Sequence, residues 1–184
     1  PRIQIQLARI ISKWRKLDSK SVKLFISNNE TQVNLFDCTY LSENDLLNLV
    51  QSIPNVTQLH LGLCGRMTDM VIDHMGKYCT HINDLTLEGP FLPTEEAFNN
   101  LLGSLKLNKL SLQYAANLNS DAIVKLLETS KDTLEYLRID QCLSIGDKGV
   151  RLLGEFDNLK TLILTDLGLS VSEESLASTI ESIG

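Results

Sequence analysis

Apolar residues recur along this chain in one short figure, L-x-x-L-x-L-x-x-C, and each copy precedes a turn and an amphipathic stretch. Residues 56–64 (VTQLHLGLC) display it most fully, with valine in the first position. Apolar and polar residues that alternate over a few positions predict a half-buried β-strand, whereas apolar residues three and four apart predict a helix. Each unit of the chain is therefore expected to form one strand followed by one helix.

The figure returns at a nearly constant interval. Its final positions are 26, 26, 25, 27 and 25 residues apart, and they are occupied by Cys38, Cys64, Pro90, Ala115, Cys142 and Leu167. A fixed period of this length is typical of leucine-rich repeats. The sequence thus predicts an α/β leucine-rich-repeat solenoid, a right-handed β-α superhelix with a concave parallel sheet and convex helices.

The expected helix starts lie 26 residues apart and are followed by acidic residues, which complement the helix dipole. The predicted caps are Ser42, Thr68, Thr94, Ser120, Gly146 and Ser172. In the helices that follow, pairs of apolar residues are expected to pack against the strand leucines. These are Leu46 and Leu49, Val71 and Met75, Phe98 and Leu101, Ile123 and Leu126, Val150 and Leu153, and Leu176 and Ile180.

Two parts of the chain are predicted. Residues 1–30 contain an amphipathic helix over residues 3–16 and a second short helix, and we expect them to form an N-terminal helical cap over the first repeat. Residues 31–184 are expected to hold about six repeats, which continue beyond the chain end or are covered there by another chain. Neither a membrane span nor a secretory signal peptide is expected.

Charge is unevenly distributed around a net value of −6. Residues 1–30 carry seven basic and two acidic residues, so the remaining residues carry ten basic and twenty-one acidic ones. An acidic body argues against repeats that bind nucleic acid by neutralising phosphates. The N-terminal bases Arg9, Lys13 and Arg15 are candidate contacts to an acidic partner or to DNA, and the alternative is that they form the solvated face of a helix.

The four cysteines are expected to be reduced thiols rather than a disulfide framework, because no C-x-x-C pair occurs and three of them end a repeat figure. A small side chain with a weak donor can reach backbone carbonyls in the turn after each strand. A zinc site with His60 is rejected, because His60 points outward from its strand while the thiols point inward.

No chemistry of a catalytic or cofactor-binding kind is predicted. The glycine-rich phosphate-binding motifs are missing from the sequence, and the three histidines have no serine or cysteine spaced for a nucleophile–base pair. We therefore expect a protein without enzymatic activity, cofactor or metal.

The concave face of the sheet remains as the candidate site. Its outward residues are mostly uncharged, which suits a protein partner better than a phosphate backbone. Phe36, Tyr136 and Arg138 are the expected anchors, since aromatic residues and arginine dominate interface energetics, and His60 lies on the same face. The alternative is an ordinary solvated sheet face.

The figure and its period resemble the cysteine-containing repeats of F-box proteins and related ubiquitin-ligase receptors. A narrower likeness lies in residues 7–13 (LARIISK), 15–17 (RKL) and 24–25 (LF), in residues 59–65 (LHLGLCG) and in residues 85–92 (LTLEGPFL). These stretches resemble the fungal radiation-sensitivity-seven family of nucleotide-excision-repair proteins. The most specific part is residues 89–92, where proline replaces the usual cysteine.

That resemblance implies a non-catalytic scaffold in a nuclear complex for global-genome nucleotide-excision repair. It also implies partnership with a Snf2-type ATPase repair subunit and with elongin C and a cullin, in a ubiquitin ligase that meets DNA only indirectly, through the complex. The alternative that the resemblance leaves open is an F-box-type substrate receptor of another ubiquitin ligase. A third hypothesis, that the chain is a direct DNA-binding module, depends only on the basic N-terminal helix.

Overall fold

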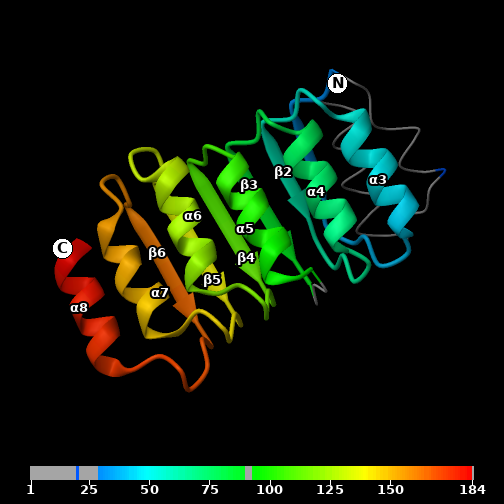
Figure 1. Ribbon diagram of the computed structural model, residues 1–184. Coiled ribbons are helices and arrows are strands. Elements are labelled where there is room, and N and C mark those ends of the chain that lie inside the picture. The colour runs from blue at the N-terminus through cyan, green and yellow to red at the C-terminus, as the bar shows by residue number, and fades with distance from the viewer. Residues whose placement is uncertain (1–19, 21–28, 90–92, 184) are drawn as a thin grey trace.

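The computed structural model describes residues 20, 29–89 and 93–183 of the chain. Within them, strands and helices alternate, and the six strands β1 to β6 form one parallel sheet in the order in which they occur along the chain. Figure 1 shows the helices side by side in a single layer over one side of this sheet, from α3 at one end to α8 at the other. The predicted leucine-rich-repeat solenoid is confirmed.

Each repeat contributes a short strand and a helix of two to three turns. The strands are β1 (Gln32–Leu35), β2 (Gln58–Leu61), β3 (Asp84–Glu88), β4 (Lys109–Gln113), β5 (Tyr136–Asp140) and β6 (Thr161–Thr165). The helices are α3 (Glu43–Ser52), α4 (Asp69–Tyr78), α5 (Glu95–Ser104), α6 (Ser120–Ser130), α7 (Gly146–Leu152), with the 3-10 turn η1 (Leu153–Glu155) behind it, and α8 (Glu173–Ile183).

The strand register stacks equivalent leucines from repeat to repeat. Leu59 of β2 lies beside Leu85 of β3, and Leu61 lies beside Leu87. These four side chains are at most 1% exposed, as are most of the helix residues that face them. Parallel strands are about 4.8 Å apart and packed helices about 8–10 Å apart, so the sheet lies on the inner, concave side of the curve.

The predicted helix starts are correct in part. Ser42 and Asp45 form a reciprocal capping box at α3, and the Thr94 hydroxyl accepts from the backbone N–H of Ala97 at α5. The prediction for α6 is off by one residue, because the cap is Asn119, whose side chain accepts two backbone N–H groups. Gly146 is likewise the first residue of α7 and not its cap.

The acidic residues of the first helical turns also join the repeats to each other. Asp69 accepts from the backbone N–H and the hydroxyl of Thr94 in the next repeat, at 2.7 and 2.9 Å. Asp147 accepts from Ser172 in the same two ways, at 2.6 and 3.0 Å. Similar side-chain contacts link Thr68 to Glu43 and Asn119 to Glu95, whereas Asp121 forms an exposed ion pair with Lys148 inside α7. An acid in the first or second position of α3, α4, α5 and α7 therefore binds the residue just before the next helix, in addition to its favourable interaction with the dipole of its own helix.

The cysteine thiols are free, buried and directed at backbone carbonyls, as predicted. The Cys64 thiol lies 3.7 Å from the carbonyl oxygen of Gly62, and the Cys142 thiol 3.4 Å from that of Asp140. Burial raises the pKa of Cys142 to about 11 and that of Cys79 to about 12. A hydrogen bond with Cys38, then burial, raise the pKa of Cys64. These groups are therefore protonated at neutral pH and play a structural role.

One core prediction is wrong. Ile180 of α8 is 68% exposed instead of packing inward. Ser175 and Thr179 take the inward positions, and the Thr179 hydroxyl donates to the carbonyl oxygen of Val150 at 2.9 Å. This bond satisfies the hydroxyl inside the protein, so a polar residue can occupy the buried face.

The predicted N-terminal cap over residues 1–30 falls almost wholly on residues that the structure does not describe. Its existence, and the division of the chain at residue 31, stay predictions. Among the residues that are described, no helix is long and apolar enough to span a bilayer.

Candidate partner-binding surface

The concave face is built from alternate strand residues, because successive side chains in a strand point to opposite sides of a sheet. The parallel register places equivalent outward residues in rows across all six strands. The central row holds Asn34, His60, Thr86, Ser111, Arg138 and Ile163. The face is therefore a continuous surface of short polar side chains with a few large ones.

The first cluster on this face lies at the ends of β1 to β4. Phe36, which directly follows β1, meets the ring of His60 edge to face, with 4.6 Å between the ring centres. His60 Nε2 lies 3.4 Å from a carboxylate oxygen of Glu88. The other oxygen of Glu88 accepts from the Gln113 side-chain amide at 3.2 Å. The structure thus brings the predicted anchor Phe36 into direct contact with His60, which was predicted for the same face.

The second cluster lies on β3 to β5. Lys109 Nζ is 3.6 Å from a carboxylate oxygen of Asp84 and 5.4 Å from the centre of the Tyr136 ring. Two residues further along β5, Arg138 Nη2 donates to Asp140 at 3.0 Å. Tyr136 and Arg138, the other predicted anchors, therefore lie on one strand and face the same side.

The two clusters are separated along the sheet. His60 is on β2 and Arg138 on β5, three strand spacings apart, which corresponds to about 14 Å. A single partner residue cannot contact both, whereas an extended segment or a folded partner can. The remaining predicted contacts, Arg9, Lys13 and Arg15, lie outside the described residues.

Charges on the face compensate each other. The five acidic and basic side chains of the two clusters each have an oppositely charged or histidine neighbour, in the pairs Asp84–Lys109, Arg138–Asp140 and His60–Glu88. Two buried nitrogens in the central row, His60 Nε2 and Arg138 Nε, nevertheless form no hydrogen bond among the described atoms, since the 3.4 Å approach of His60 Nε2 to Glu88 is an ionic contact without hydrogen-bond geometry. The face is polar and nearly neutral, which suits a protein surface better than a run of phosphates.

No group of three or more metal-ligating side chains occurs in the described part of the chain. Lys109, Glu88 and Gln113 were expected on this face, but sequence reasoning did not identify them as the neighbours that hold the anchors. Their signal was present in the repeat alignment, since Asp84 and Lys109 occupy the same position in successive repeats, as do Glu88 and Gln113.

Comparison with known proteins supplies two curated relatives and a structural neighbour, although no protein-family model matches the chain. DNA repair protein rhp7 of Schizosaccharomyces pombe is 30% identical over 182 residues, which cover 97% of this chain and 32% of rhp7. DNA repair protein RAD7 of Saccharomyces cerevisiae is 24% identical over 143 residues, which cover 77% of this chain and 25% of RAD7. This chain therefore spans about a third or less of either relative.

The structural neighbour is a yeast Rad7 chain, solved in complex with Elc1. It superposes with a TM-score of 0.82 at 22% identity, over 98% of this chain and 46% of the Rad7 chain. At this level of identity the comparison supports a statement about the fold alone. The fold of this chain agrees with that of the Rad7 chain.

Proposed function

We propose that this chain, a homologue of part of the Rad7 and rhp7 DNA repair proteins, is a repeat scaffold that binds proteins in a nuclear DNA-repair complex. The observation that carries the proposal is the 30% identity to rhp7, which extends over 97% of the chain. The repair process to which we assign this complex is global-genome nucleotide-excision repair. The chain itself is assigned no catalytic step.

The features of the concave face support a role in protein binding. Its charges are paired within the face, and the body of the chain is acidic, so strong attraction to a DNA backbone is not expected. Aromatic and arginine side chains stand among small polar ones, which is the composition of energetically important interface residues. DNA is therefore expected to be met indirectly, through other subunits.

The proposed partners are a Snf2-type ATPase repair subunit and elongin C within a cullin ubiquitin ligase. Elongin C is suggested by the yeast Rad7 structure, whose second component is Elc1. The ATPase and the cullin come from the family resemblance of residues 59–65 and 85–92. An F-box-type receptor would instead recruit the adaptor that recognises F-boxes.

Reconstitution separates these assignments. The 184-residue chain is mixed with the purified ATPase subunit, with elongin C, and with the F-box adaptor, and each mixture is analysed by size exclusion. Co-elution with the ATPase or elongin C, without the F-box adaptor, is expected. Co-elution with the F-box adaptor alone would assign the chain to the other ligase class.

Direct DNA binding is tested with the same chain by fluorescence anisotropy, on damaged and undamaged duplexes at physiological salt. We expect dissociation constants no tighter than those of non-specific binding, about 10⁻⁴ to 10⁻⁶ M. Submicromolar binding that persists without residues 1–16 would contradict the proposal, because it would place a DNA site on the repeats.

The binding face is tested by Tyr136→Ala combined with Arg138→Ala. We expect capture of the partner found by reconstitution to weaken by about tenfold or more, since such anchors carry much of the interface energy. The melting temperature should change little, because both side chains lie partly exposed on the outer face of the sheet and outside the leucine core. Thr161→Ala is the matched control, since Thr161 pairs with Tyr136 in the register and is exposed. Unchanged capture by the double variant would place the partner on another surface.

A further inference from the structure

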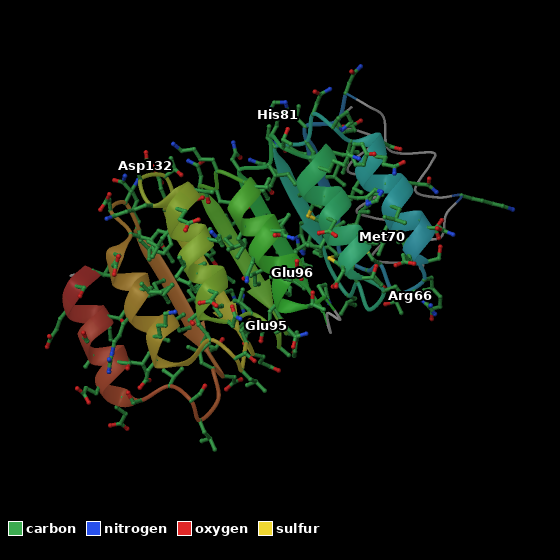
Figure 2. The ribbon with its side chains drawn as sticks, viewed as in Figure 1. Arg66, Met70, His81, Glu95, Glu96 and Asp132 are labelled. Carbon is green, nitrogen blue, oxygen red and sulfur yellow. The ribbon has the colours of Figure 1, made fainter. Side chains whose placement is uncertain are left out.

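Exposed apolar side chains gather along the edge of the solenoid where the strands end and the helices begin. Among the described residues, seven large hydrophobic side chains are exposed, and all but Ile180 lie in these loops or in the first turn of a helix. They are Tyr40, Leu63, Met70, Tyr114, Leu143 and Leu169. Figure 2 places Met70 on this edge with Arg66, Glu95 and Glu96, opposite the edge that carries His81 and Asp132. We call this row of six side chains the loop-edge row.

Two members of the loop-edge row sit on an unfavourable backbone. Leu63 has φ of 52° and Tyr114 has φ of 62°, in the left-handed region that L-residues other than asparagine and aspartate seldom adopt. The same turn holds Gly89, Gln141 and Asp166 in other repeats, so a small or polar residue serves the turn equally well. Leu63 and Tyr114 nevertheless place large apolar side chains here, and each leaves about half of its surface exposed to solvent.

The loop-edge row is bordered by acidic residues. Exposed carboxylates stand in the same loops and first helical turns, whereas the exposed bases there are Arg66 and Lys148. The carboxylates are Glu95, Glu96, Asp121, Asp166, Glu173 and Glu174. An apolar strip beside a negative strip is complementary to a segment with one apolar and one basic face.

We propose that the loop-edge row is a docking surface for a basic, amphipathic segment of a partner protein. The row extends over five repeat intervals, about 24 Å, which matches the length of a helix of about 16 residues. The apolar face of the segment packs on Leu63, Tyr114 and Leu143, and its lysines or arginines face the flanking carboxylates. This surface is separate from the concave face and does not depend on the function proposed above.

The proposal is tested with a fluorescent model helix of about 16 residues, made of leucine and lysine so that one face is apolar. A scrambled peptide of the same composition keeps the charge and loses the apolar face. The protein variant is Leu63→Asn combined with Tyr114→Asn, which removes the apolar groups and leaves residues that accept the left-handed conformation. This variant is expected to melt at or above the temperature of the unsubstituted chain.

We expect the model helix to bind the 184-residue chain, and the Leu63→Asn/Tyr114→Asn variant to bind it about fivefold or more weakly. Glu96→Gln combined with Glu174→Gln should also weaken binding and reduce its dependence on salt. Ile180→Asn removes an exposed apolar residue away from the row and should leave binding unchanged.

The proposal is overturned if the helix does not bind, if the scrambled peptide binds equally well, or if the Leu63→Asn/Tyr114→Asn variant binds like the unsubstituted chain. Deletion of residues 1–16 distinguishes a partner from the basic N-terminal segment of this chain. A large gain in peptide affinity on deletion would make that segment the occupant. Self-association that the same double variant abolishes would assign the row to a second copy instead, and either result contradicts docking of a partner.

Discussion

Single residues in this chain act mainly across repeat boundaries. The aspartates and glutamates of the first helical turns were expected from the sequence to serve their own helix dipoles. In the structure several of these carboxylates also accept hydrogen bonds from the residue just before the next helix, as Asp69 does from Thr94 and Asp147 from Ser172. The exact 26-residue spacing of these acids indicates that they lie in a row across successive repeats. A sequence pattern alone nevertheless assigns a first-turn acid to the helix in which it occurs.

Asp147 should make stability depend on pH. A hydrogen bond from the backbone N–H of Ser172 lowers the pKa of this carboxyl below its ordinary range. A pKa that falls on folding means that the ionised form stabilises the folded state. That contribution is complete above the pKa of the unfolded chain, about 3.9, and is lost as the pH falls through the lower folded pKa.

The measurement compares urea unfolding of the unsubstituted chain and Asp147→Asn at several pH values. The substituted chain should be less stable at pH 7, and the difference should shrink towards zero below about pH 4. Asp73→Asn is the control for the loss of an exposed helix aspartate, since Asp73 is exposed on α4. A difference that stays constant down to low pH would exclude the proposed hydrogen-bonding role of the ionised carboxylate.

The elements of this fold differ in how well the sequence predicts them. Strands were predicted closely, because alternating leucines have only one face on which to be buried, and the register follows from equal spacing. Helix positions were also predicted, but the buried face of α8 was predicted incorrectly. Its buried face carries Ser175 and Thr179 rather than Ile180, and a pattern of apolar residues cannot anticipate a hydroxyl that is satisfied by a carbonyl of the preceding repeat.

The candidate surface was predicted as a set of outward residues but not as clusters. The repeat alignment shows that Phe36 and Arg138 are on one face, yet it does not show which side chains touch. The contact of Phe36 with His60 and that of Lys109 with Tyr136 depend on side-chain directions that only coordinates supply. The loop-edge row was missed for a different reason, since an exposed leucine in a loop has no pattern that distinguishes it from a buried one.

The turn after each strand should be sensitive to the chemistry of its cysteine. Cys64→Ser replaces a thiol that is fully buried and 3.7 Å from the Gly62 carbonyl by a more polar group with shorter bonds. We expect a loss of about 1–3 kcal/mol in the free energy of unfolding, because the hydroxyl is buried without a well-placed acceptor. Chemical denaturation of the two chains measures this difference in the free energy of unfolding.

Cys64→Ala is the matched variant, because it removes the sulfur without introducing a hydroxyl. It should cost less than the serine variant if desolvation of the hydroxyl dominates. Equal losses in the two variants would show instead that the lost packing of the sulfur atom is responsible.

At the scale of the whole molecule, stability should be graded along the solenoid, because each repeat contacts chiefly its neighbours. Leu85 of β3 has a repeat on both sides and is 0% exposed. Leu162, the equivalent residue of β6, is only partly buried, and β6 pairs with β5 alone within the described sheet. The same substitution should therefore have different effects at the two positions.

Leu85→Ala is expected to lower the free energy of unfolding by about 2–5 kcal/mol, the range for a fully buried leucine, and Leu162→Ala by clearly less. Hydrogen exchange should show the same gradient, with the amides of β6 and α8 exchanging faster than those of β3 and β4. Binding of a protein over β6 should slow exchange there and leave the central strands unaffected. Uniform protection from β3 to β6 in the isolated chain would mean that the repeats unfold as one unit, and the nearest-neighbour description would then fail for this solenoid.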